Sequence, residues 1–101
     1  MEQPGPWVVF VDDNFHYMDE QEKYRLGSYG SYEAAEAVCR RVVDRSLAGL
    51  LQPGMTAEEL WQQYRCFGED PFIRGPEPSG ETFSAWRYAK VRCPEVAGGP
   101  A

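Results

Sequence analysis

The chain has 101 residues, enough for one domain with a single hydrophobic core, and its fourteen aromatic residues supply much of that core. It carries 16 acidic and 10 basic residues, which gives a net charge of −6. No basic run is present that would neutralise phosphates or attract an anionic lipid surface, so we predict neither a nucleic-acid nor a membrane partner.

The N-terminal segment 1–6 reads MEQPGP, and we predict that it is flexible. It has neither the basic start nor the apolar run of a signal peptide, which favours a cytoplasmic location. The longest uninterrupted apolar stretch covers residues 7–11 and is far shorter than the ~20 residues that a membrane-spanning helix needs.

Two strands are predicted near the N-terminus. Residues 7–11 are β-branched or aromatic, which is typical of a buried strand, and residues 24–29 form a second strand. Together they predict an antiparallel hairpin whose connection covers about residues 12–22. Hairpin loops usually have about 2–5 residues, so this long connection needs an explanation.

The tip of that connection is apolar although its flanks are acidic, because it reads Phe15-His16-Tyr17-Met18. An apolar patch with a charged rim is typical of a docking surface. The same side chains would also suit a loop that folds back onto the core of its own domain. The sequence leaves both interpretations open.

A metal or catalytic role for the connection is less favoured. Asp12 and Asn14 match the first and third positions of a calcium-binding loop, but Tyr17 replaces its glycine and Lys23 replaces its final glutamate. His16 could act as a base beside an aspartate, yet no partner nucleophile has a matching spacing. We therefore predict no metal, cofactor or catalytic residue.

Two helices follow. Residues 31–52 carry an apolar stripe at spacings of three and four, with Ser31 as the N-cap and Pro53-Gly54 after the end. Thr56 and Glu59 then form a capping box that opens a helix to about Cys66, and Gly68 is the expected stop.

The remaining chain is predicted as a loop and a last helix. Residues 69–81 contain three prolines and two glycines and read as a loop, in which Phe72 and Ile73 anchor the chain or form a very short third edge strand. A helix then begins at Thr82 or Ser84, runs to about Arg92 and is ended by Pro94.

These elements predict a single α+β domain over residues 7–93, with a disordered tail over residues 94–101. A small antiparallel hairpin sheet, with or without a short third edge strand, would be covered by three helices. The predicted order is β-β-α-α-(β)-α.

A second candidate surface combines aromatic and basic residues of the last two helices. Trp, Tyr and Arg are the residue types that dominate protein–protein hot spots. Core spacing predicts burial for Trp61 and Trp86, so Arg87 and Tyr88, beside that stripe, are the better candidates for exposure. The residues of this surface are Trp61, Tyr64, Arg65, Trp86, Arg87 and Tyr88.

The cysteines form no recognisable set. Cys39, Cys66 and Cys93 lack any zinc-ligand spacing, and we predict three reduced thiols. A Cys66–Cys93 bridge and a reactive thiol remain the alternatives.

The sequence resembles known families in two ways. "LGSYGSYEAAEAV", residues 26–38, resembles the junction between sheet and helix in AP2-type and integrase-arm DNA-binding domains. Those families place basic residues on the preceding strands, which are acidic or apolar here, so the resemblance implies only how the helix packs on the sheet. DNA binding is not expected.

Over most of its length the chain is similar to a small bacterial family of uncharacterised proteins, a domain of unknown function. That resemblance rests on "VDDNFHYMDE", "YEAAEAVCRRVVD", "PGMTAEELWQQYRCFGEDPFI" and "FSAWRYAKVRC". It implies an independently folding domain and no particular chemistry.

The sequence does not assign a function, and it favours a module that binds another protein or itself. The alternative is a small-molecule-binding protein or minor enzyme with a pocket near His16 and with Tyr64 among its walls. The candidate interaction surface comprises Phe15, His16, Tyr17, Met18, Phe72, Arg87 and Tyr88.

Overall fold

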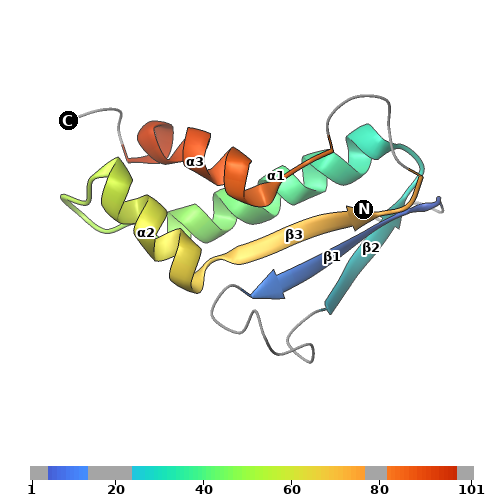
Figure 1. Ribbon diagram of the computed structural model, residues 1–101, viewed down its shortest axis with the longest axis horizontal. Coiled ribbons are helices and arrows are strands. Elements are labelled where there is room, and N and C mark those ends of the chain that lie inside the picture. The colour runs from blue at the N-terminus through green and yellow to red at the C-terminus, as the bar shows by residue number, and fades with distance from the viewer. Residues whose placement is uncertain (1–4, 14–23, 77–81, 98–101) are drawn as a thin grey trace.

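The computed structural model describes residues 5–13, 24–76 and 82–97 (Figure 1). The predicted α+β fold is confirmed, with a three-stranded antiparallel sheet and three helices. In chain order the elements are β1 (Trp7–Asp13), β2 (Tyr24–Tyr29), α1 (Tyr32–Leu50), α2 (Ala57–Phe67), β3 (Glu69–Arg74) and α3 (Ala85–Val96).

The sheet has the order β2-β1-β3, so the most apolar strand is the central one. β1 pairs with β3 over six residues, from Val8 opposite Arg74 to Asp13 opposite Glu69. The third strand, expected as a loop or a very short strand, is therefore as long as β2. Pro71 hides the strand signal, but β3 is an edge strand, where the missing N–H is tolerated.

Helix α1 begins where the sequence predicts. The hydroxyl of Ser31 caps it by accepting a hydrogen bond from the Ala34 N–H, at 3.1 Å. The first half of the helix lies on the sheet, where buried Val9 packs with Ala35 and Cys39.

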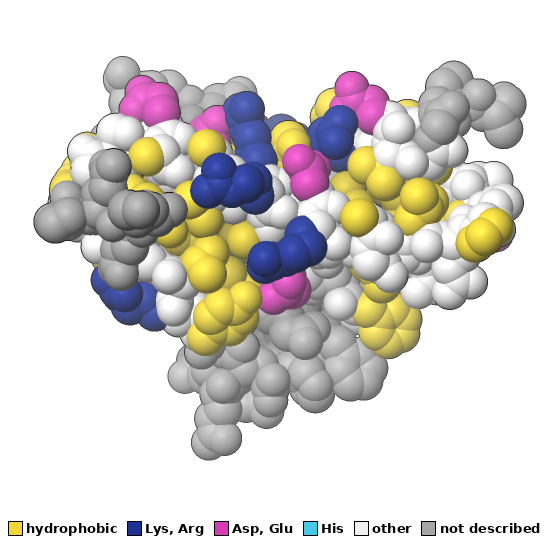
Figure 2. Space-filling model, turned by 180° about the vertical axis from the view of Figure 1, so that it is seen from behind, with side chains coloured by type: hydrophobic (Ala, Val, Ile, Leu, Met, Phe, Trp, Pro, Cys, Tyr) yellow, Lys and Arg dark blue, Asp and Glu magenta, His cyan; other side chains and the backbone are white. Residues whose placement is uncertain are grey.

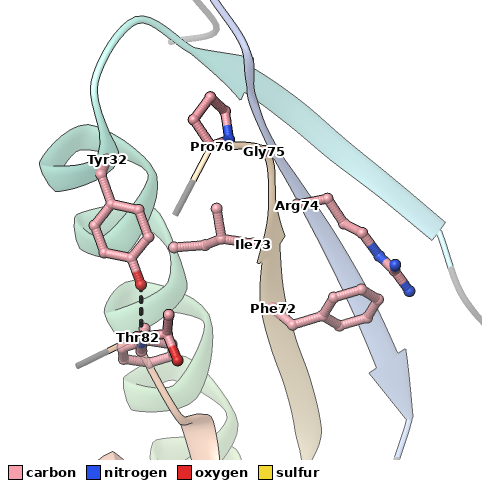
Figure 3. A pocket seen from close by; sticks show the side chains of 8 residues that line it. Tyr32, Phe72, Ile73, Arg74, Gly75, Pro76 and Thr82 are labelled. Atoms are coloured by element: carbon pink, nitrogen blue, oxygen red, sulfur yellow. Dashed lines mark hydrogen bonds between the residues drawn. The ribbon is translucent and has the colours of Figure 1, made fainter. Parts of the chain in front are cut away.

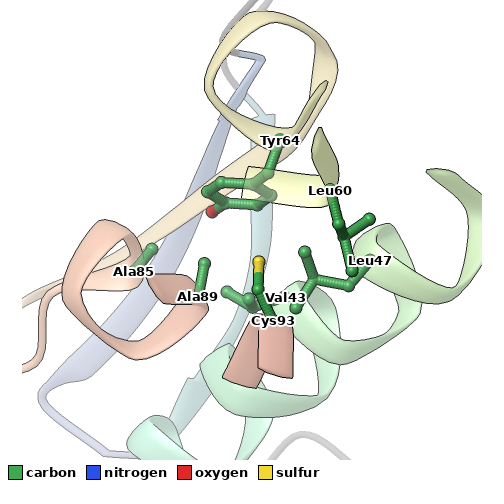
Figure 4. Close-up of a cluster of buried hydrophobic side chains, with 7 residues drawn as sticks. All are labelled: Val43, Leu47, Leu60, Tyr64, Ala85, Ala89 and Cys93. Atoms are coloured by element: carbon green, nitrogen blue, oxygen red, sulfur yellow. The ribbon is translucent and has the colours of Figure 1, made fainter. Parts of the chain in front are cut away.

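The second half of α1 packs with α2 and α3, which gather at one end of the molecule (Figure 1). Side chains from all three helices converge there on a buried cluster, which we call the helical core (Figure 4). Its members are Val43, Leu47, Leu60, Tyr64, Ala85, Ala89 and Cys93.

The two ends of α2 match the prediction. The Thr56 hydroxyl accepts from the Glu59 N–H at 3.1 Å, and the Glu59 carboxylate accepts from the Thr56 N–H at 2.9 Å, which completes the capping box. Gly68 is the C-cap, with an ordinary φ of −78°. A Cβ atom there would lie 2.3 Å from the ring of Tyr64, so the close approach of that ring requires the glycine.

The predicted end of the last helix is wrong, because α3 passes through Pro94 and ends at Val96. A proline near the end of a helix removes few backbone hydrogen bonds. The next bond is still made, from the Ala97 N–H to the Cys93 carbonyl at 2.9 Å. No helix within the described ranges is long and apolar enough to cross a lipid bilayer.

Candidate functional site

The predicted interaction residues fall into three groups. Phe15, His16, Tyr17 and Met18 lie outside the residues that the structure describes. Phe72 lies on β3, where its ring stacks on Phe10 of β1. Arg87 and Tyr88 lie on α3, beside α1. Phe72 therefore belongs to a different surface from Arg87 and Tyr88.

A groove between α1 and α3 brings Arg87 and Tyr88 together with residues that the sequence did not single out. Its volume is about 270 Å³. We call it the arginine groove. Its main lining residues are Glu36 and Arg40 of α1, together with Phe83, Arg87, Tyr88 and Val91 from the α3 side.

Tyr88 is held in one orientation on the wall of this groove. Its hydroxyl donates to the two carboxylate oxygens of Asp44, at 3.0 and 3.1 Å. Burial and the bond to Asp44 raise the pKa of Tyr88, so the hydroxyl stays protonated. The Arg92 Nε donates to the same carboxylate at 3.0 Å and compensates its charge.

Positive charge lies at the rim of the arginine groove. The Arg40 guanidinium lies 5.7 Å from the centre of the Tyr88 ring, within the range of a cation–π contact, and also pairs with Glu36 one turn earlier. Arg87 is exposed. The groove thus presents Arg40 above its aromatic wall and the exposed Arg87 in its lining.

The apolar part of the groove comes from Phe83 and Val91. The Phe83 ring lies 5.9 Å from the Tyr88 ring, and its backbone N–H donates to the Tyr32 hydroxyl at 2.6 Å. Val91 stands on the rim and is 65% exposed, more than any other large hydrophobic side chain that the structure describes. An apolar segment lying in the groove would remove both side chains from water.

The aromatic surface predicted on the last two helices is only partly formed. Trp61 and Trp86 meet edge to face at 5.8 Å, and the Arg65 guanidinium lies 5.6 Å from the Trp61 ring. Trp86 is 41% exposed, so the burial predicted for it is wrong. The inward positions of α3 are instead the small residues Ala85 and Ala89, because the large ring of Tyr64 fills the space opposite them.

Tyr64 was expected to line a pocket near His16, which itself lies outside the residues that the structure describes. The side chain of Tyr64 is fully buried in the helical core, and its hydroxyl donates to the Glu69 carbonyl at 2.7 Å. Burial raises the pKa of Tyr64 strongly, so it acts as a structural donor.

A second cavity, of about 330 Å³, lies between the start of α1, the end of β3 and the start of the segment leading into α3 (Figure 3). Ile73 points toward α1 across this space, whereas Phe72 and Arg74 point to the other side of the strand. The alternation of β3 thus separates a face under α1 from a face that carries Phe72 and Arg74.

Metal binding has no candidate cluster among the described residues, whereas Cys66 is an exposed thiol. No three His, Cys, Asp or Glu side chains among them are grouped to hold a metal ion. All three cysteines are free, so the alternative Cys66–Cys93 bridge is not formed. Cys39 is buried, and its burial raises the pKa of its thiol to about 12, which makes it unreactive near neutral pH.

Comparisons of the chain with protein-family models, with curated proteins and with solved structures find no match. The geometry of the described surfaces is therefore the basis for a functional proposal.

Proposed function

We propose that this protein is an interaction module that binds a partner protein in the arginine groove, and that the partner contributes an extended segment with acidic and aliphatic side chains. The observation that carries the proposal is the arrangement of Arg40, Arg87 and Val91 around the aromatic wall formed by Phe83 and Tyr88.

The charge distribution supports an acidic partner. The whole chain carries −6, but residues 83–101 contain three basic residues and one acidic residue. Arg40 of α1 adds a further basic side chain to the lining of the groove, beside Glu36. Figure 2 shows one face on which Lys and Arg side chains lie across the middle, with Asp and Glu side chains among them and hydrophobic side chains on both sides. Such a local concentration of charge orients an acidic segment although the molecule as a whole repels it.

The fixed position of Tyr88 supports binding rather than accidental packing. Its hydroxyl is held by Asp44, and Asp44 is held by Arg92. A ring that is already ordered loses little conformational entropy when a partner covers it. Tyr and Arg are also the residue types that contribute most to binding free energy in interfaces.

The test uses a fluorescent peptide of alternating Glu and Leu residues, with a Lys–Leu peptide as the matched probe. We expect the fluorescence anisotropy of the acidic peptide to rise as the protein is added. The basic peptide should bind more weakly. The variant Arg87→Gln should bind the acidic peptide roughly tenfold more weakly, because it loses one charge-assisted hydrogen bond. Arg65→Gln is the control, because Arg65 is likewise an exposed arginine but lies on α2.

Val91 provides a sharper test, because it is largely exposed on the rim. Its replacement leaves intact both the helical core and the packing of α1 on the sheet. Val91→Glu should abolish binding of the acidic peptide, and Val91→Lys should strengthen it. Equal affinities for these two variants, or equal affinities for Arg87→Gln and Arg65→Gln, would refute the proposal.

A further inference from the structure

The sheet has a second face, separate from the arginine groove, with an ordered charge pattern. α1 is the helix that packs on β1, and it covers the face that carries Val9 and Ile73. Because side chains alternate along a strand, Phe10 and Phe72 belong to the opposite face. No residue of that opposite face belongs to the helical core or to the buried cluster between α1 and the sheet.

The register of β1 and β3 arranges this face in rows across the strands. Val8 stands opposite Arg74, Phe10 opposite Phe72, and Asp12 opposite Asp70. Over β1 and β3 the face therefore runs from a positive row, through an aromatic row, to a negative row, while β2 adds the exposed Arg25 opposite Phe10.

The aromatic row is well packed. The two Phe rings stack at 5.7 Å with an angle of 21° between their planes, and the Arg74 guanidinium lies 5.4 Å from the centre of the Phe72 ring. Figure 3 shows Phe72 and Arg74 projecting to the same side of β3. The positive and aromatic rows thus form one continuous surface.

The order of rows on β1 and β3 is complementary to itself, so the contact is placed on these two strands, with Arg25 of β2 at its edge. We propose that the face binds a second copy of the chain, with a two-fold axis that lies between the two sheets and runs across the strands along the aromatic row. The axis places the Arg74 row of each copy against the Asp70 row of the other, and the Phe rows against each other. Residue i then meets residue j while j meets i, as an interface between identical subunits requires.

The acidic row supplies a reason for this pairing. Asp12 and Asp70 are neighbours across two strands, and like charges in that position repel each other. Burial and the charge of Asp12 raise the pKa of Asp70 to about 6. An arginine from a second copy would offset this repulsion, whereas a partner with acidic groups at that end would increase it.

The expected dimer is weak, because two strands of six or seven residues offer a small contact area. Interfaces of this size are transient, and we expect a dissociation constant on the order of 100 µM. The dimer does not use the arginine groove, so Arg87→Gln should leave it unchanged and each proposal can fail without the other.

The test is sedimentation velocity of the full chain from about 10 µM to about 1 mM, with a charge-exchange pair. Arg74→Asp and Asp70→Arg should each weaken dimerisation at least tenfold, because each places like charges together twice in the dimer. An equimolar mixture of the two variants should dimerise again, because every facing pair then regains opposite charges.

Recovery in the mixture depends on contacts between chains, so a folding defect or a contact within one chain cannot produce it. The proposal is overturned if the wild type stays monomeric to about 1 mM. It is also overturned if the wild type dimerises but the mixture of variants does not. Phe72→Ser is the further variant, and it should dimerise more weakly than Phe67→Ser, which changes an exposed Phe on α2.

Discussion

The helical core and the sheet stabilise the molecule in different ways. In the helical core, side chains from α1, α2 and α3 enclose one another, and its seven members are all buried. In the sheet, α1 covers one face, while the other carries Phe10, Phe72 and the charged rows. The difference suggests that most of the stability lies at the helical end and that the surfaces suited to binding lie along α1 and on the sheet.

The largest expected effect comes from two leucines, one in each region. Leu60 is fully buried in the helical core, whereas Leu26 on β2 is 36% exposed. Leu60→Ala should lower the free energy of unfolding by about 3 kcal/mol, because it leaves a cavity, and Leu26→Ala by less than about 1 kcal/mol. Urea denaturation followed by circular dichroism measures both. Similar losses for the two variants would mean that the sheet is packed as tightly as the helical core.

The next effect concerns the link between the two regions, at the junction of α2 and β3. The Tyr64 hydroxyl donates to the Glu69 carbonyl from within the helical core. Tyr64→Phe removes this bond and should cost about 1–2 kcal/mol, because the carbonyl loses a partly buried partner. Tyr24→Phe is the matched control, since its hydroxyl bonds the Glu69 carboxylate at an exposed site. If Tyr64→Phe lowers the free energy of unfolding by less than Tyr24→Phe does, the Tyr64 hydrogen bond does not link the two regions.

Stability should depend on pH through the sheet rather than through the helical core. The pKa of Asp70 is about 6 in the folded protein, above its ordinary 3.8, so folding takes up a proton between these values. Stability from this group therefore rises as pH falls from 7 toward 4. The gain is about 1 kcal/mol once solvent screening of a partly exposed carboxyl is allowed for.

Asp70→Asn isolates this effect, because asparagine stays neutral like the protonated acid. The variant should be more stable than the wild type at pH 7, and the difference should shrink by pH 5. A difference that does not change with pH would show that Asp70 titrates normally.

The smallest effect on stability is expected in the arginine groove. Glu36 pairs with Arg40 at an exposed i,i+4 position, and such pairs contribute roughly 0.2–0.5 kcal/mol. Glu36→Gln should therefore change the unfolding free energy by less than about 0.5 kcal/mol. It should also strengthen binding of the Glu–Leu peptide, because Arg40 loses its competing partner. Weaker binding would place Glu36 among the groups that the partner needs.

Local interactions made the helices predictable. Ser31 and the Thr56–Glu59 capping box act within one turn of the chain, so the sequence alone shows where α1 and α2 begin. Non-local pairing hid β3, because its partner β1 lies some sixty residues earlier and Pro71 is an unusual strand residue. The register shift between Val9 and Phe10, opposite Leu26, likewise depends on how β2 meets β1.

The sequence predicted which types of residue form the candidate site, but it identified only some of the residues that line it. Arg87 and Tyr88 stood out because such side chains favour interfaces. Arg40 read only as part of the charged face of a helix, and nothing in the sequence placed it above Tyr88. The exposure of Trp86 was missed because the small residues of α3, rather than its large ones, face the helical core.

The central claim is that the arginine groove binds an acidic segment while the cores stay unchanged. A two-dimensional ¹H–¹⁵N spectrum, recorded as the Glu–Leu peptide is added, tests it most directly. We predict shift changes that cluster on Arg40, Phe83, Arg87, Tyr88 and Val91. An unchanged spectrum, or changes confined to α2 and the sheet, would contradict the claim.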